Sequence, residues 1–379
     1  MGCGSGYTSL LLAEANPGAK IIGIDISEPS VEMARKRLLY HQYTDAEFHA
    51  MDIKDLLNLG QSFDYINCND TLYLLPDPIS ALKSMRSVLS PQGTIRANLH
   101  DLFSRERFLR SQQLWQFLGL MDDAPSKTES NIVREIVDSL QDTVILKFQA
   151  WLNVDQGSEP EEFVFMNHLF HGDCGFTIPQ MFEMLNASNL EFISMVNWKH
   201  WDLFNLFSAK QNIPTCFDAT LSNPEELKLY VYELLNPIVR LLDFWCGHPM
   251  ECVNYTSADN WDHSIWLHTR IFLNPYLKIG RVKSALDHAI TSFTPFVITD
   301  FFSYTTIEPI FLSTQSAICL RLVWDRSITF DQLVKQWLRI KPLNLLTLEP
   351  MTEAEAFAEI KQTLIEMEAY MFVMLETSH

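Results

Sequence analysis

Three glycines at the start of the chain and one later aspartate have the types and spacing that most clearly indicate chemistry. Gly2, Gly4 and Gly6 form a G-x-G-x-G turn, and the segment after them is helical in pattern. An apolar strand over residues 21–24 follows and ends at Asp25. Glycine lets a ligand approach the backbone closely, and a carboxylate at the end of the second strand can accept hydrogen bonds from both hydroxyls of a ribose. The pattern therefore predicts a site for the adenosine part of a cofactor.

The spacing of the glycines distinguishes between cofactors. A dinucleotide fingerprint, G-x-G-x-x-G, would need glycine at position 7, and this residue is Tyr7. The turn therefore favours S-adenosylmethionine over a nicotinamide cofactor. The competing interpretation is a glycine turn and a strand-end aspartate that serve only the structure of an α/β domain.

The elements that must position these residues alternate between helix and strand over residues 1–99, which is typical of a doubly wound α/β fold. Strands are expected at residues 21–26, 48–51, 63–68 and 94–99, with helices at 8–15, 29–38 and 77–89. A glycine turn of this kind normally follows a buried strand, whereas only Met1 precedes it here. The predicted fold is thus a Rossmann-like sheet that lacks its first strand.

The middle of the chain interrupts this alternation. Residues 103–121 and 127–141 read as amphipathic helices, with a short strand expected at 144–146. We interpret residues 103–165 as an inserted helical cap. A helix at 177–187 and a strand at 190–196 then complete one α/β domain over residues 1–204.

Residues 205–379 are predicted to form a second, mainly helical domain with a regulatory or substrate-binding role. Asn223-Pro224 is expected to cap a helix that runs to Trp245. A β-branched and aromatic run, Ser316–Trp324, precedes a capped helix over residues 327–338, an order similar to that of a winged-helix module. The capping box of Thr352 and Glu355 predicts a terminal helix that reaches about residue 375.

Composition excludes several classes of function. The chain of 379 residues carries a formal net charge of −19, which would repel a phosphate backbone, so nucleic acid is not an expected partner. No apolar stretch is long enough for a membrane span and no signal peptide is visible. The seven cysteines form no C-x-x-C pair, which indicates a reducing cytoplasm.

Residues 1–100 resemble the class I S-adenosylmethionine-dependent methyltransferases. The matching segments are Gly2–Gly6, Gly23–Ser27, Asp52-Ile53, Leu72–Pro78 and Val88–Gly93. The resemblance implies a seven-stranded sheet and S-adenosylmethionine as the cofactor. It also implies that the glycines face the methionine part, that Asp25 holds the ribose, and that Asp52 and Ile53 cradle the adenine. The cofactor-binding residues implied are Gly2, Cys3, Gly4, Gly6, Asp25, Ile26, Asp52, Ile53 and Asn69.

One part of the family pattern has no counterpart in this chain. The first strand and the acidic residue just before the glycine turn would lie upstream of Met1. The sequence therefore predicts that the native, active protein is longer.

Three residues are candidates for catalysis. Asn69 and Asp70 match the position that usually lies near the transferred methyl group. The segment from His168 to Gln180 resembles a stretch that lies over the active site in methyltransferases with an extra C-terminal region. This predicts His168, His171 and Asp70 as a general base or as orienting groups, against the alternative of histidines with ordinary hydrogen bonds. His263 and His268 are one residue too far apart for a helical metal pair, so no metal is expected.

The sequence therefore predicts a cytoplasmic methyltransferase that acts on a protein side chain or a small metabolite. Residues 205–379 resemble the regulatory region attached to some protein-lysine methyltransferases, and homodimer formation is left open. The alternative is a catalytically silent scaffold or regulatory protein. A nucleic-acid methyltransferase is disfavoured by the charge and by Asn69-Asp70-Thr71-Leu72, which stands where such enzymes carry a tetrad like N-P-P-Y.

Overall fold

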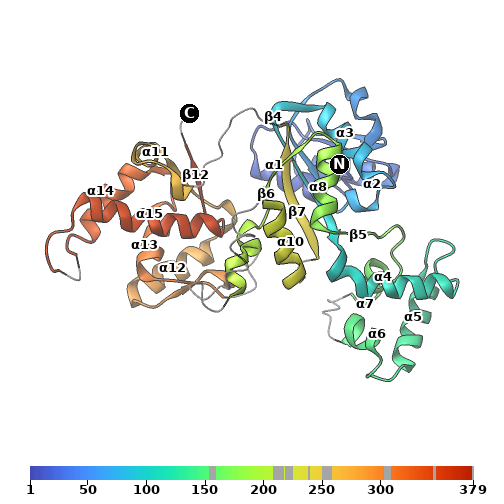
Figure 1. Cartoon of the computed structure of the whole chain (residues 1–379). Helices are drawn as coiled ribbons and strands as arrows, with labels where there is room; N and C mark the ends of the chain where they lie inside the picture. Colours follow the sequence, from blue (N-terminus) through green and yellow to red (C-terminus); the bar gives the residue numbers. More distant parts are fainter. Residues whose placement is uncertain are drawn as a thin grey trace. The chain divides into compact units, whose positions relative to one another are not determined.

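The chain divides into two compact units (Figure 1). Unit 1 contains Met1–Val196 and Trp201–Met250, and unit 2 contains Asn197–His200 and Glu251–His379. The computed structural model describes residues 1–152, 159–207, 217, 225–237, 240–249, 258–302, 309–344 and 347–377.

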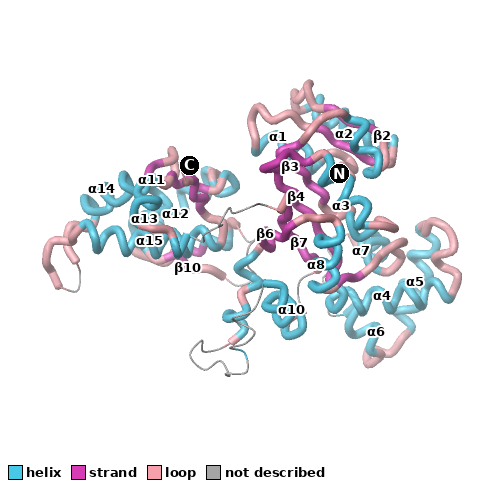
Figure 2. The backbone as a smooth tube through the Cα atoms, turned by 45° about the horizontal axis from the view of Figure 1, so that its top comes forward, coloured by secondary structure: helices cyan, strands magenta, loops and turns pink. Residues whose placement is uncertain are grey.

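A mixed sheet forms the centre of unit 1. Its strands lie in the order β3 (Phe63–Cys68), β4 (Leu89–Asp101), β7 (Leu241–Gly247) and β6 (Glu191–Met195). Strand β4 is parallel to β3 and antiparallel to β7, and the strands lie side by side in Figure 2. A short strand, β5 (Gly175–Phe176), pairs with the end of β4. The predicted α/β architecture is confirmed.

A second, smaller sheet pairs β1 (Ile22–Asp25) with β2 (Glu47–Ala50) in parallel. Residues 1–3 run between this sheet and the central one. The backbone N–H of Cys3 donates to Ile24 O on β1 over 2.8 Å, and the Met1 nitrogen donates to Asn67 O on β3 over 2.6 Å. The glycine turn is thereby fixed at the carboxyl ends of β1 and β3, where open α/β sheets bind ligands.

Three helices pack around these strands in unit 1: α1 (Tyr7–Ala15), α2 (Glu28–Tyr40) and α3 (Pro78–Ser87). The Ser27 side chain caps α2, and the Asp77 side chain caps α3. At Gly6, φ is 78° and a Cβ would lie 2.7 Å from the Cα of Ala34 on α2. Only glycine therefore lets α1 begin so close to α2.

A group of helices lies beyond the end of β4 (Figure 1). It consists of α4 (Leu102–Phe117), α5 (Lys127–Ser139), α6 (Ile145–Lys147), a π-helix η3 (Phe148–Leu152) and α7 (Pro160–Asn167). This helical insertion has its own core around Phe108, Trp115 and Trp151. The strand expected at residues 144–146 is wrong, because this segment turns into α6. Helix α8 (Ile178–Ala187), with its capping box at Thr177 and Gln180, then leads to β6.

The sheet of unit 1 extends beyond the boundary expected at residue 204. Strand β7 pairs with β4 from Thr94 to His100, so the chain returns to the sheet before it enters unit 2. The long helix expected up to Trp245 is wrong: α10 spans Glu225–Leu235, and Trp245 lies in β7. Its expected cap, Asn223-Pro224, lies outside the described residues.

Unit 2 packs helices against a three-stranded antiparallel sheet in the order β11 (Ile328–Thr329), β8 (Arg270–Leu273), β12 (Val373–Glu376). The helices are α11 (His263–His268), α12 (Gly280–Ser292), α13 (Thr314–Leu322), α14 (Phe330–Ile340) and α15 (Glu353–Ala369), and β9 (Phe296–Val297) pairs with β10 (Phe311–Leu312). None of the helices in the described part of the chain combines the length and apolarity needed to cross a bilayer.

Two expectations for this unit change. The run Ser316–Trp324 is not a strand, because it lies largely in α13, which is capped by Ser313. The terminal helix starts at the predicted capping box but ends at Ala369, and β12 follows it. A winged-helix relationship stays a prediction.

The two units have separate cores, which predicts separable effects of core substitutions. Phe244 on β7 and Phe330 on α14 are both fully buried, one in each core. Each change to alanine should cost its own unit about 3–5 kcal/mol of unfolding free energy. Differential scanning calorimetry should show one transition lowered by Phe244→Ala and the other by Phe330→Ala. A single transition lowered equally by both would show that the units do not unfold separately.

Candidate active site

The glycine turn leaves open space on one side. Gly2, Gly4 and Gly6 have φ values of 62°, 48° and 78°, in the left-handed region that favours glycine. A Cβ on Gly4 would meet no atom within 4 Å, whereas one on Gly2 would lie 2.1 Å from Oγ1 of Thr71. Gly2 is therefore pressed against the loop after β3, and Gly4 borders a space that a ligand could enter.

The carboxylate of Asp25 holds this turn to the end of β1. Its Oδ2 accepts from the backbone N–H of Gly4 over 2.8 Å, and its Oδ1 accepts from that of Ser27 over 2.9 Å. Each carboxylate oxygen keeps a lone pair for a further donor. The next side chain, Ile26, is 81% exposed although it is apolar.

The end of β2 lies beside Asp25, since Asp25 pairs with Ala50 and its carbonyl accepts from Met51 N. Asp52 follows and caps the 3-10 helix η1 (Ile53–Leu59) through Lys54 N. The structure thus brings Asp25 and Asp52 to one edge, as the sequence predicts. Ile53 is instead buried in the core of unit 1.

Cys3 contributes its backbone to the turn rather than a reactive thiol. Burial, and then the nearby Asp25 charge, raise the pKa of the Cys3 thiol to about 11. The side chain is therefore a neutral thiol near pH 7, which is a poor nucleophile.

A buried asparagine orders the loop that follows β3. Asn98 on β4 donates through Nδ2 to Oδ1 of Asn69 over 2.6 Å and accepts from Asp70 N over 2.9 Å. Asp70 has a φ of 51°, a left-handed conformation that few residues other than glycine, asparagine and aspartate adopt readily. The Asn98 contacts hold the loop in this conformation, with Asp70 exposed next to the segment that touches Gly2.

A network of buried polar side chains continues from this loop into the protein. The Tyr73 hydroxyl donates to Oδ1 of Asp70 over 3.4 Å, and the Tyr73 ring stacks on His100 with ring centres 3.7 Å apart. Nδ1 of His100 lies 2.5 Å from Oδ1 of Asp173. Arg105 donates to Oδ2 of Asp173 over 2.6 Å, and Gln112 donates to the same oxygen over 2.9 Å.

Burial and pairing set the charges in this network. Burial opposes ionisation of Asp173, but the hydrogen bond with His100 and the charge of Arg105 hold its pKa at about 2. Burial lowers the pKa of His100, and the hydrogen bond to Asp173 only partly opposes this. At neutral pH His100 is therefore uncharged, donates from Nδ1 to the Asp173 carboxylate, and presents Nε2 as an acceptor.

Comparison with known proteins identifies the family of the first part of the chain. Residues 1–149 match the model of a methyltransferase domain. These residues are therefore similar to a methyltransferase domain. The predicted resemblance to the class I S-adenosylmethionine-dependent methyltransferases is confirmed for them.

Two curated relatives match about a quarter of the chain each. Trans-aconitate 2-methyltransferase from Escherichia fergusonii is 34% identical over 101 residues, which are 27% of this chain and 38% of that protein. A ubiquinone biosynthesis O-methyltransferase from Coxiella burnetii is 32% identical over 95 residues, 25% of this chain and 39% of that protein. The matched region thus spans well under two thirds of the length of these relatives.

The fold of one solved structure matches along nearly the whole chain. The structure of PKMT2 from Rickettsia typhi aligns with 99% of this chain and 69% of its own, with a TM-score of 0.65 and 16% identity. A second structure of that protein, in complex with AdoHcy, aligns equally well at 17% identity. At this identity the match shows a shared fold.

Unit 1 does not bring both predicted histidines to the site. His168 is buried in the core of the helical insertion, where Nδ1 lies 3.0 Å from the Ser111 hydroxyl and Nε2 lies 3.2 Å from Ala150 O. Burial lowers the pKa of His168 to about 4. With both ring nitrogens engaged, His168 packs the insertion and is not available to a substrate. His171 is exposed, and its Nε2 lies 3.1 Å from Asp123 O.

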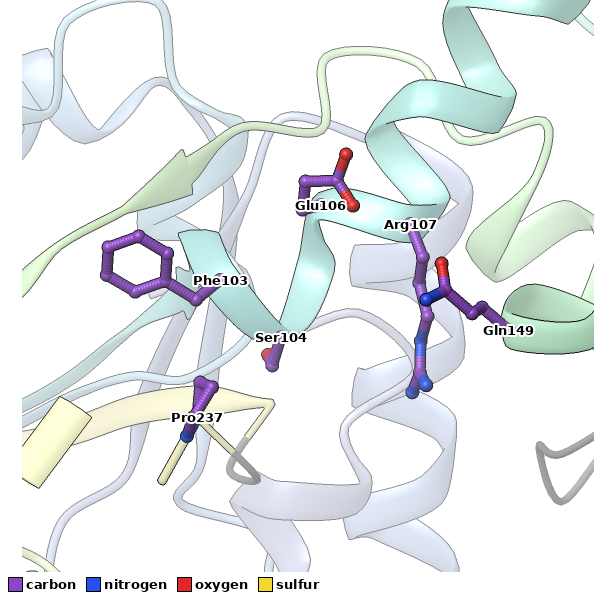
Figure 3. Close-up of a pocket in the computed structure, with 6 residues that line it drawn as sticks. All are labelled: Phe103, Ser104, Glu106, Arg107, Gln149 and Pro237. Atoms are coloured by element: carbon purple, nitrogen blue, oxygen red, sulfur yellow. The ribbon is translucent and has the colours of Figure 1, made fainter. Parts of the chain in front are cut away.

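Unit 1 also has a hollow at the base of the insertion, with a volume of about 370 Å³ (Figure 3). It is lined by Phe103, Ser104, Glu106, Arg107, Gln149 and Pro237. None of these residues belongs to the glycine turn or to the network around Asp173. Within the described residues, no cluster of histidine, cysteine, aspartate and glutamate could hold a metal ion.

Several residues of the domain's site were missed from the sequence. Asn98 and His100 fall in a segment predicted only as a strand. The pattern that could have revealed them is two polar side chains in a run of buried residues, 97–101, at the end of β4. Asp173 and Arg105 gave no signal, because they meet His100 only in the folded chain.

A carboxyl pair at the end of β4 predicts how stability depends on pH. Burial and the hydrogen bond with Asp101 raise the pKa of Glu233 to about 8, and burial also raises the pKa of Asp101. Glu233 therefore keeps its proton in the folded state at neutral pH. The contribution of this raised pKa to the free energy of unfolding is fully present below the usual glutamate pKa and is lost as pH rises through about 8. Glu233→Gln mimics the protonated form, so it should lose less stability than the wild type between pH 7 and pH 9, by at least about 1 kcal/mol.

The measurement is urea unfolding at pH 7, 8 and 9. Glu226→Gln on the same helix is the control and should follow the wild type. If the free energy of unfolding changes with pH in the same way for Glu233→Gln and the wild type, Glu233 does not keep a proton in the folded state at neutral pH.

Proposed function

We propose that this protein transfers a methyl group from S-adenosylmethionine to a protein side chain or a small metabolite. The observation that carries the proposal is the Asp25 carboxylate, which is bonded to Gly4 N beside open space. To fix three glycines in left-handed conformations costs conformational entropy on folding, and such a turn is used where a ligand must approach the backbone. The family of residues 1–149 supports the same activity.

The residues of the turn fit the cofactor. Asp25 has lone pairs free to accept the ribose hydroxyls, and the exposed Ile26 offers an apolar surface to the adenine. Asp52 lies at the neighbouring strand end and would contact the adenine edge. Gly2, Cys3, Gly4 and Gly6 would border the methionine part through their backbone. S-adenosylmethionine supplies an activated methyl group, so the protein needs mainly to place an acceptor atom in line with it.

The acceptor would lie beside the loop after β3. Asn69 and Asp70 are held there by Asn98, and Asp70 is exposed and can accept a proton or a hydrogen bond from the acceptor. We assign His171 only an orienting role. Its ring nitrogen contacts Asp123 O on the helical insertion and no described residue of the loop after β3. Unit 2, whose described part includes a three-stranded sheet and helices α11 to α15, would regulate the domain or contribute to acceptor selection, and a winged-helix role belongs to this proposal.

PKMT2 has a fold that covers 99% of this chain, and its structure in complex with AdoHcy supports the proposed cofactor. The trans-aconitate and ubiquinone biosynthesis enzymes each match about a quarter of this chain, and their names support a metabolite. A catalytically silent scaffold is the competing function. The left-handed conformations of Gly2, Gly4 and Gly6 beside the Asp25 carboxylate argue against it, since a scaffold does not require them.

The test is isothermal titration of S-adenosylhomocysteine into the wild type and into Asp25→Asn. The amide cannot accept the same hydrogen bonds at both oxygens, so the substitution should weaken binding at least tenfold. Asp45→Asn, which removes an exposed carboxylate elsewhere in the unit, should bind as the wild type does. Equal affinity of the wild type and Asp25→Asn would contradict the assigned site. No binding by any form would favour the scaffold.

A further inference from the structure

Arg240 is a charged side chain near the proposed site that the function described above does not use. It lies just before β7 and is exposed at the surface of unit 1. Its backbone carbonyl accepts from Asp101 N over 3.0 Å, which fixes the arginine next to the end of β4. Its guanidinium reaches Nε2 of His100, with Nη2 at 3.3 Å and Nε at 3.4 Å.

The position of Arg240 relative to the loop after β3 follows from its contacts. His100 stacks on Tyr73, and the Tyr73 hydroxyl donates to Asp70. Burial raises the pKa of Tyr73 to about 12, and the Arg240 charge partly opposes this, so Arg240 also lies close to Tyr73. Arg240 is therefore one aromatic layer away from the loop that carries Asn69 and Asp70.

The charge of Arg240 has no counterpart in the part of the chain that the structure describes. Arg96 pairs with Asp243, Arg105 with Asp173 and Arg321 with Asp287, but no described carboxylate lies within ion-pair distance of Arg240. The buried Asp173 is already balanced by Arg105, and His100 is neutral. In a chain with a net charge of −19, Arg240 donates to a neutral histidine rather than to a described carboxylate.

The contacts with His100 and Tyr73 involve one side of the Arg240 guanidinium. The Asp173 carboxylate fixes the tautomer of His100, so the Nε2 lone pair holds Arg240 without cancelling its charge. The remaining guanidinium N–H groups keep the planar geometry that matches a carboxylate with two parallel hydrogen bonds. Pre-orientation of this kind lowers the entropy lost when a ligand binds.

We propose that Arg240 binds a carboxylate of the methyl acceptor and so restricts acceptors to small carboxylic acids. The proposal rests on the proposed methyl transfer and names its acceptor class. The surface charge of the chain favours a small acid over an acidic protein, because a large anion would be repelled over an extended area. Within a small molecule the carboxylate would sit at Arg240 and the atom to be methylated would lie toward Asp70.

The experiment measures ligand-observed NMR saturation transfer on the full chain with S-adenosylhomocysteine present. The probes are succinate and benzoate, with succinamide and benzamide as uncharged matches. At least one acid should bind the wild type, with a dissociation constant of roughly 1–10 mM, and its amide should not. Arg240→Gln should weaken acid binding at least tenfold. Arg240→Lys should bind acid with an affinity between those of the wild type and Arg240→Gln, because lysine keeps the charge but lacks the planar pair of N–H donors.

Two controls separate the possible failures. Lys83→Gln removes an exposed positive charge from α3 and should leave acid binding unchanged. Titration of S-adenosylhomocysteine into Arg240→Gln should give the wild-type affinity, which also shows that the variant is folded. If the acids and amides bind alike, if neither acid binds the wild type, or if Arg240→Gln binds acid like the wild type, the proposal is wrong while methyl transfer stands. If S-adenosylhomocysteine binds no form, the proposed function fails and the acceptor assignment fails with it.

Discussion

The buried carboxylate of Asp173 is the interaction on which the arrangement around the site depends. Its side chain has no solvent exposure and accepts from Arg105 and Gln112 on α4, and it faces His100 on β4. An isolated buried carboxylate is strongly unfavourable, and removal of one partner from a buried ion pair costs about 3–5 kcal/mol. The helical insertion and the central sheet are therefore held together where the chain passes from α7 to β5. Asn167 and Met166 O complete the contacts of Arg105 at the end of α7.

The imidazole ring of His100 connects the buried Asp173 carboxylate to the exposed Arg240. Because Asp173 fixes the tautomer of His100, the imidazole offers a flat face to Tyr73 and a lone pair to Arg240. The same strand also carries Asn98, two residues before His100, which orders the loop of Asn69 and Asp70. Strand β4 thus orders the loop of Asn69 and Asp70 through Asn98 and holds Arg240 through His100. Both roles come from polar side chains that are completely buried in β4.

The parts of the site that the sequence predicted are those made by residues close together in the chain. The glycine turn, the strand that ends at Asp25 and the following cap at Ser27 fall within one short segment, so their geometry follows from local rules. The partners of His100 lie 73 and 140 residues away, at Asp173 and Arg240, and no local pattern links them. His168 misled for a related reason: two histidines three residues apart resemble a pair, but the end of α7 turns one into the core of the insertion and the other to the surface.

The errors in the fold have similar causes. Residues 241–247 alternate between half-buried and buried positions, and the predicted helix ran over this short pattern although Asn236-Pro237 separates it from α10. In α13 the cap at Ser313 and the helical burial pattern outweighed the β-branched composition. Tertiary pairing with β4 and local capping decided these segments, and composition alone carries neither.

The central claim is that the glycine turn and Asp25 form the cofactor site of a methyltransferase. Hydrogen–deuterium exchange of the full chain, with and without saturating S-adenosylhomocysteine, tests it most directly. The account predicts slower exchange in peptides that cover residues 2–6 and 25–27, with a smaller effect at 69–71 and none in unit 2. Unchanged exchange over residues 2–6 and 25–27, or protection confined to other segments, would contradict it.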